Sequence, residues 1–150
     1  MKKNYLAILL TAFATNVAVA DCQSLKPLGP GDVNSAKPDL LFKNMLAACK
    51  SGAPERFFAL QSKKSSYLLS KLSSSDKSQL FSQYCTFTQE ANKTLGGHPE
   101  SGIHSFKQDN YKTTECGQKM SFWYVHSKNG ALALRLEVTL ENGQLRIDTH

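Results

Sequence analysis

The sequence predicts an α+β fold: N-terminal helices packed on one face of a C-terminal antiparallel β-meander, with two disulfides. Between residues 39 and 95 apolar side chains recur every three or four positions, which is typical of amphipathic helices. After Gly97 the apolar period changes to two, which is typical of half-buried strands. Because the helical patterns all precede the strand patterns, the order is that of an α+β domain.

The first twenty residues have the pattern of a secretory signal peptide. Lys2 and Lys3 precede a short apolar run, and residues 18–20 (Ala-Val-Ala) form a small-x-small cleavage site. The run is shorter than the ~20 apolar residues needed to span a bilayer. A lipid anchor on Cys22 is the alternative, but Asp21 stands where a lipoprotein signal needs a small residue. We therefore expect cleavage near Ala20 and a bacterial periplasmic or secreted protein with no stable membrane anchor.

About 130 residues remain after cleavage, which is enough for one domain with its own core. The formal net charge is +6, and loss of the two leader lysines reduces it to +4. No block of like charges appears, so nucleic-acid binding is not indicated. We divide the chain into a signal peptide (1–20), an irregular arm rich in proline and glycine (21–38) and a single α+β domain (39–150).

All four cysteines, Cys22, Cys49, Cys85 and Cys116, lie in the mature part of the chain. An even count in an exported protein predicts two disulfides. A zinc site is the alternative, but no C-x-x-C pair supplies adjacent ligands. We therefore predict no metal and no cofactor. Three connectivities are possible, of which we favour Cys22–Cys49 with Cys85–Cys116.

Local signals predict where the helices begin and end. Asp39 is a suitable N-cap for the first helix, which Gly52 would end. Pro54 suits the first turn of a second helix. A short third helix is expected around residues 67–72. A longer fourth helix would run from a cap at Ser75 to the glycines at 96–97.

Two Asn-Gly dipeptides, at 129–130 and 142–143, predict tight two-residue hairpins. The strands expected around them cover 119–128, 131–141 and 144–149, and weaker strands are expected at 103–108 and 111–116. Directly opposed residues share a face of the sheet. One face is then apolar and is expected to pack on the helices; it carries Trp123, Val125, Leu134, Leu136, Val138, Leu140, Leu145 and Ile147.

The opposite face of the predicted sheet mixes aromatic and charged side chains. In the expected register Tyr124 opposes Arg135, and Phe122 opposes Glu137. A solvated face with charges paired across the strands is one interpretation. A binding surface is the other, because tyrosine and arginine are favoured at interfaces. The candidate binding residues are Phe122, Tyr124, His126, Arg135, Glu137 and Arg146.

No catalytic motif is evident. The chain has no G-x-S-x-G, and no cysteine stays free once both disulfides form. The histidines and glutamate of residues 98–104 (HPESGIH) match no helical zinc motif, which favours a polar loop. Glu137 and Asp148 oppose each other and could form an acid–base dyad. The neighbouring arginines would instead keep both carboxylates ionised.

The element order, the helix–Gly–helix start AACKSGAPERFFAL and the closing strands RLEVTLENGQLRI resemble the nuclear transport factor two-like (cystatin-like) α+β superfamily, over residues 39–149. The resemblance implies a cone-shaped fold that hosts both enzymes and binding modules. Enzymatic members place acid–base residues inside the cone, where this chain is expected to be apolar.

We therefore expect a non-catalytic exported protein that binds a protein partner or small ligand. An inhibitor or immunity protein against an envelope-acting enzyme is one such function. The alternative is a small enzyme or small-ligand carrier that uses a helix–sheet pocket, with Glu137, Asp148 or His126 as its reactive groups.

Overall fold

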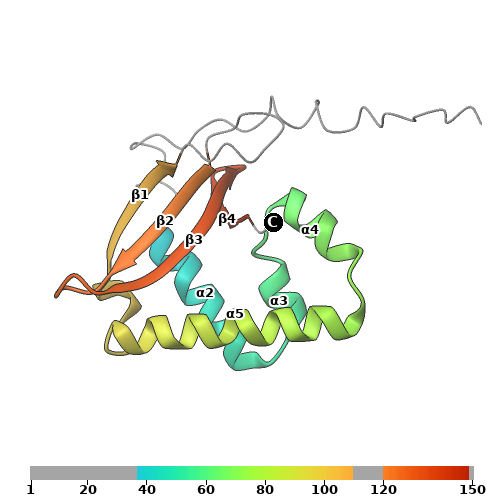
Figure 1. Cartoon of the computed structure of the whole chain (residues 1–150), viewed down its shortest axis with the longest axis horizontal. Helices are drawn as coiled ribbons and strands as arrows, with labels where there is room; N and C mark the ends of the chain where they lie inside the picture. Colours follow the sequence, from blue (N-terminus) through green and yellow to red (C-terminus); the bar gives the residue numbers. More distant parts are fainter. Residues whose placement is uncertain (1–36, 110–119, 149–150) are drawn as a thin grey trace, which may run out of the picture.

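The computed structural model describes residues 37–109 and 120–148, in which helices precede a four-stranded antiparallel sheet of order β1-β2-β3-β4 (Figure 1). The helical elements are α2 (Pro38–Ser51), α3 (Pro54–Phe58), α4 (Lys63–Ser70), α5 (Ser74–Thr94) and a 3₁₀ turn, η2 (Pro99–Ser101). The strands are β1 (Ile103–Asp109), β2 (Met120–His126), β3 (Leu132–Glu141) and β4 (Gln144–Ile147). The α+β class is confirmed. The signal peptide, nearly all of the arm and the strand predicted at 111–116 lie outside the described residues.

The predicted cap of the first helix was wrong. Lys37 is the N-cap of α2 and Pro38 its first residue. Proline suits this position because it has no N–H to leave unpaired and its φ is already helical. Asp39 therefore lies within the first turn, where its carboxylate still faces the positive end of the helix dipole. Gly52 ends the helix as predicted, with φ 67°.

The cap of the long helix α5 is Ser73, two residues before the predicted Ser75. The Ser73 Oγ accepts a hydrogen bond from the Asp76 backbone N–H (3.1 Å) and donates one to the Asp76 carboxylate (2.6 Å). A serine followed three residues later by an acidic side chain satisfies two groups at once. The run of three serines hid this preference, because each of them is an acceptable cap by itself.

The two Asn-Gly hairpins differ. Asn142 (φ 52°) and Gly143 (φ 73°) form the predicted two-residue turn between Glu141 and Gln144. The turn at 128–130 is one residue longer than predicted, since Ser127 N–H donates to the Ala131 carbonyl (2.9 Å). Here the prediction of a two-residue turn was wrong.

The register of β2 on β3 is nevertheless the predicted one. His126 pairs with Leu132 and Val125 with Leu134, so Ala133 is the extra residue of a β-bulge. The extra residue in the turn and the extra residue in the bulge compensate each other. From Val125 back to Phe122 each pair therefore matches the prediction, including Tyr124 with Arg135.

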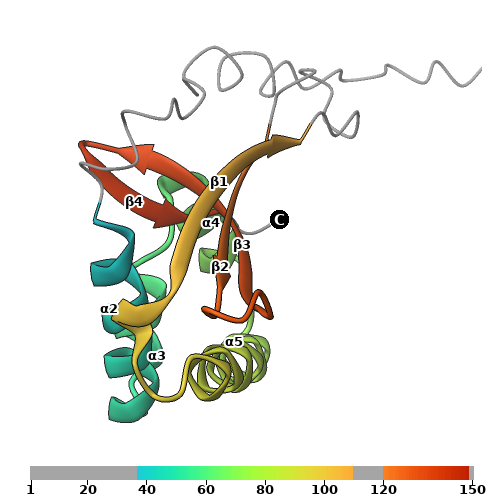
Figure 2. The ribbon, with the colours of Figure 1, turned by 90° about the vertical axis from the view of Figure 1, so that its left-hand side faces the viewer.

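The apolar face of the sheet forms the core with the helices, as predicted. Trp123 is fully buried and meets the Phe42 ring of α2 edge to face, with centroids 6.2 Å apart. Phe57 of α3, also fully buried, packs on Tyr84 of α5 (5.2 Å between centroids). Figure 2 shows the curved sheet with α2 along one side and α5 crossing below. Also buried on this face are Val125, Leu134, Val138, Leu145 and Ile147.

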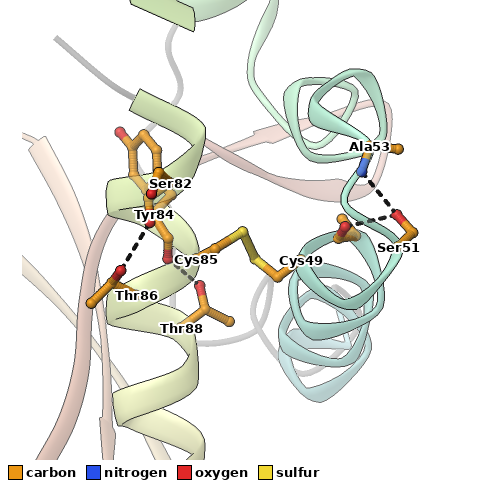
Figure 3. The surroundings of a disulfide bond; sticks show 9 residues. Cys49, Ser51, Ala53, Ser82, Tyr84, Cys85, Thr86 and Thr88 are labelled. Atoms are coloured by element: carbon orange, nitrogen blue, oxygen red, sulfur yellow. Dashed lines mark hydrogen bonds between the residues drawn. A yellow bond between two sulfur atoms is a disulfide. The ribbon is translucent and has the colours of Figure 1, made fainter. Parts of the chain in front are cut away.

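A disulfide joins Cys49, near the end of α2, to Cys85 in α5 (Figure 3). The favoured pairing of each with a different cysteine was therefore wrong. The two helices pack side by side, which brings the Cα atoms of Cys49 and Cys85 to 5.3 Å, a spacing that suits a disulfide. Cys22 and Cys116 lie outside the described residues.

The segment between α3 and α4 runs parallel to β4 and ties the helices to the last strand. Ile147 N–H donates to the Leu60 carbonyl (3.0 Å), and Ser62 N–H donates to the Ile147 carbonyl (2.8 Å). This short pairing fixes the start of α4 beside the end of the described chain. In the part of the chain that the structure describes, no helix is long and apolar enough to span a membrane.

Candidate functional site

The outer face of the sheet carries an aromatic row along β2. Phe122, Tyr124 and His126 occupy alternate positions, so their side chains project from the same face. The Phe122 and Tyr124 ring centroids are 6.5 Å apart. The His126 ring stacks on Tyr124 at 6.3 Å with an interplanar angle of 13°.

Two cations from the neighbouring strands flank this row. Arg135 of β3 places its guanidinium carbon 4.3 Å from the Phe122 centroid, and its Nε donates to the Tyr124 hydroxyl (3.2 Å). Lys107 of β1 has its Nζ 5.4 Å from the Tyr124 centroid. Each such cation–π contact contributes about 0.5–1 kcal/mol at an exposed site. We name Lys107, Phe122, Tyr124, His126 and Arg135 the cation–aromatic cluster.

The members of the cluster differ in exposure. Phe122 is only 8% exposed, while Arg135, whose guanidinium lies over its ring, is an exposed residue. Tyr124 and His126 are half-buried, and Lys107 is exposed. An approaching molecule would therefore meet two positive charges and the Tyr124 and His126 rings before it met Phe122. That combination suits a partner that carries carboxylates and aromatic side chains.

The structure brings only part of the predicted binding set together. Glu137 lies opposite Phe122 in the sheet, beside the cluster. Arg146 does not join it. Its guanidinium donates to the Ala59 carbonyl (2.8 Å) and to the Gln144 side chain (2.7 Å), so it holds the end of α3 against β4.

Asp148 has a structural environment that the sequence did not reveal. It is opposite Glu137 as predicted, because its N–H donates to the Glu137 carbonyl (2.9 Å). Its carboxylate, however, accepts hydrogen bonds from the hydroxyls of Ser62 (2.7 Å) and Ser65 (2.8 Å) at the start of α4. Asp148 is 6% exposed and Ser65 fully buried. The geometry is that of a buried bridge between α4 and the sheet.

The predicted polar loop around residue 100 divides into two parts. His98 and Glu100 are exposed and 3.3 Å apart (Nδ1 to Oε1). Hydrogen bonds from the Glu100 backbone N–H and from His98 lower the pKa of Glu100. His104 lies apart from them in β1. Among residues 37–109 and 120–148, no group of three or more histidine, cysteine or acidic side chains could hold a metal ion.

His104 packs on the only tryptophan of the chain. Its ring stacks on Trp123 at 5.7 Å and 13°, and Trp123 Nε1–H donates to His104 Nδ1 (3.1 Å). This bond requires an unprotonated Nδ1, so the proton of the neutral ring is on Nε2. Within the described part of the chain the buried Nε2 has no hydrogen-bond partner. Protonation would set a second N–H against the tryptophan N–H, so the fold requires neutral His104.

His104 should therefore make stability depend on pH. Burial lowers its pKa from the ordinary value of 6.5, and the Asp39 carboxylate opposes this by a smaller amount. A depressed pKa means that the stabilisation is present above about pH 6.5 and is lost as the pH falls through the folded-state pKa. We expect the melting temperature of the wild type to fall more between pH 7.5 and pH 5 than that of His104→Phe, which keeps an aromatic ring but cannot titrate.

The same experiment with His98→Gln serves as the control, because His98 is an exposed residue. That variant should follow the wild-type curve. If His104→Phe and the wild type lose stability in parallel, His104 does not titrate differently in the folded and unfolded states.

A cavity of about 280 Å³ lies between α5 and β3, where the sequence placed a possible helix–sheet pocket. Met45, Tyr84 and Leu134 are among its lining residues, with Glu90 and Arg135 as its charged ones. None of the predicted reactive groups, Glu137, Asp148 and His126, lines it. The pocket and the candidate acid–base residues are thus in different places.

No protein-family model, curated protein or solved structure matches this chain. The resemblance to the nuclear transport factor two-like superfamily therefore stays a prediction from the element order.

Proposed function

We propose that this chain is a non-catalytic exported binding protein whose cation–aromatic cluster recognises a protein partner. The observation that carries the proposal is the position of Tyr124 between Lys107 and Arg135, both exposed. The bond from Arg135 to the Tyr124 hydroxyl holds both side chains in place before a partner arrives. Less conformational entropy is then lost on binding, which favours affinity.

The partner should present carboxylates to the two cations and an apolar or aromatic group to the Tyr124 and His126 rings. A protein surface offers both, and arginine and tyrosine frequently dominate the binding free energy of such interfaces. An inhibitor or immunity protein that covers an envelope-acting enzyme is the version we favour, because a small disulfide-containing domain suits that task.

Export is supported by the leader-like N-terminus and by the Cys49–Cys85 disulfide, which is compatible with an oxidising compartment. We propose that a second disulfide joins Cys22 to Cys116. Of the three possible connectivities, this is the one that remains when Cys49 is joined to Cys85.

Mass spectrometry of the secreted protein tests this. Without reductant, the intact mass should be about 4 Da below that of the reduced protein, because each S–S bond removes two hydrogens. Its value should correspond to a chain that starts at Asp21. Peptide mapping should recover Cys22 linked to Cys116. Two free thiols in the native protein would exclude the second disulfide.

The binding proposal is tested by capturing envelope proteins with the immobilised mature chain. Tyr124→Ala or Arg135→Ala should weaken capture of the partner about thirtyfold, since truncation of a dominant interface residue costs about 2 kcal/mol. Tyr124→Phe should keep the ring contacts and lose the hydrogen bond from Arg135.

Arg56→Ala is the matched control, because Arg56 is an exposed arginine on α3. It should leave capture unchanged. If wild type, Tyr124→Ala and Arg135→Ala retain the same protein equally well, the cluster is not the recognition site.

A further inference from the structure

Helix α4 buries one serine and exposes most of its large apolar side chains. Ser65 is fully buried against Asp148, whereas Tyr67 is 61% and Leu68 42% exposed. Leu72, just after the helix, is 38% exposed. Only Leu69, at 7%, faces inward as an apolar residue normally would. The buried Asp148 explains why Ser65 faces inward, but nothing in the fold requires Tyr67 and Leu68 to face solvent.

The outward side chains form two rows at the four-residue spacing that places helix residues on one face. The first row is Lys63, Tyr67 and Lys71, and the second is Lys64, Leu68 and Leu72. The Lys71 Nζ lies 4.2 Å from the Tyr67 ring centroid. We name these six residues the α4 face. Lysines and large apolar side chains thus lie side by side on it.

All charged side chains of the α4 face are positive. No acidic residue occurs between Lys63 and Ser75. Of the nearby acids, Glu141 accepts a hydrogen bond from the Lys63 backbone N–H (2.9 Å), and Asp148 lies buried beneath the helix. Asp76 bonds to its own helix cap. None of the three lysine ammonium groups makes an ion pair with a residue that the structure describes.

The position of α4 leaves this face accessible. The helix lies at the end of the molecule opposite the β2–β3 hairpin, joined to the body at both of its ends (Figure 1). All six residues of the α4 face are exposed. The hydrogen bonds from Ser62 and Ser65 to the buried Asp148 hold the inner side of the helix, and this fixes the α4 face toward the outside.

We propose that the α4 face docks reversibly on an anionic lipid bilayer. Lysines beside phosphate headgroups, with aromatic and leucine side chains entering the headgroup boundary, are the chemistry of interfacial helices. Three of the six residues are lysines, which are depleted at protein interfaces but are attracted to the phosphate groups of anionic lipids. The proposal does not depend on the cation–aromatic cluster, which lies on a different element.

Co-sedimentation of the mature protein with vesicles tests the proposal. We expect binding to vesicles of phosphatidylglycerol and phosphatidylcholine, weakened by salt, and none to phosphatidylcholine alone. Lys64→Gln/Lys71→Gln should weaken binding about 25-fold, because each lysine near an anionic surface contributes about fivefold. Tyr67→Ser/Leu68→Ser should weaken it about tenfold through loss of apolar burial.

Matched substitutions elsewhere on the protein distinguish an effect of the α4 face from an effect of total charge or total exposed apolar surface. Lys50→Gln/Lys93→Gln removes the same charge from exposed positions on α2 and α5, and Phe87→Ser removes a side chain that is 63% exposed. Both controls should keep wild-type binding to within twofold. The proposal is wrong if the wild type does not bind anionic vesicles, or if the charge control weakens binding as much as the α4 variant. It is also wrong if the Tyr67/Leu68 variant binds normally, because attraction would then be purely electrostatic.

Discussion

Replacement of both Cys49 and Cys85 by alanine is expected to lower the free energy of unfolding by about 4 kcal/mol. The bond closes a loop of 36 residues, and loss of that constraint increases the entropy of the unfolded chain. It also joins the two helices that carry much of the core, α2 and α5. Urea unfolding followed by circular dichroism at neutral pH measures the change.

Both cysteines are replaced together so that no free thiol can pair with Cys22 or Cys116. Addition of reductant to the wild type should bring its unfolding midpoint at least as low as that of the double variant. A loss below 1 kcal/mol would mean that the constraint on the unfolded chain is not what stabilises the fold.

Asp148→Ala is expected to cost about 3 kcal/mol. The carboxylate accepts hydrogen bonds from the hydroxyls of Ser62 and Ser65, and bonds to a charged acceptor contribute about 1.5–3 kcal/mol each. Their loss leaves two hydroxyls buried at the base of α4 without their acceptor. Chemical denaturation gives the stability, and hydrogen exchange should show that amides of α4 lose protection first.

Asp148→Asn is the informative companion, because its amide oxygen can still accept from both serines. It should lose less than half as much stability as the alanine variant. If the two substitutions are equally damaging, negative charge rather than hydrogen bonding is what the serines require. If neither has an effect, the bridge does not hold α4.

Helix caps, turn dipeptides and apolar periodicity predicted most of the fold, because each depends only on residues close together in the chain. Gly52 and the turn at Asn142 adopt the positive φ values that favour glycine and asparagine, so the sequence places them correctly. The hairpin at Asn129 shows how a local error can leave the global result intact. Its longer turn would have shifted each strand pair, but the bulge at Ala133 restored the pairing.

Contacts between distant segments were beyond what the sequence could predict. The partner of Cys49 depends on how α2 lies against α5, and no spacing along the chain encodes that geometry. The role of Asp148 depends on serines more than eighty residues away. Its position opposite Glu137 had suggested an acid–base dyad and gave no sign of these hydrogen bonds.

The sequence predicted which residues of the candidate site share a face of the sheet, but not how their side chains contact one another. Alternation correctly placed Phe122, Tyr124 and Arg135 on one surface. It could not predict that the Arg135 guanidinium would lie over Phe122, since that depends on side-chain conformations. Lys107 was missed because β1 had only a weak strand signal, yet its pairing with β2 brings it beside Tyr124.

The pairing of residues 60–62 with the end of β4 also predicts an order of assembly. Ser62 and Asp148 are 86 residues apart, whereas Cys49 and Cys85 are separated by only 36. Contacts that close shorter loops form sooner, because less chain entropy is lost before the contact forms. A chain that emerges N-terminus first can therefore pair α2 with α5 and oxidise that bond while its strands are still being delivered. Helix α4 reaches its final position only after Ile147 and Asp148 have joined it, so its exposed lysines, tyrosine and leucines are presented on a fixed scaffold only once β4 is in place.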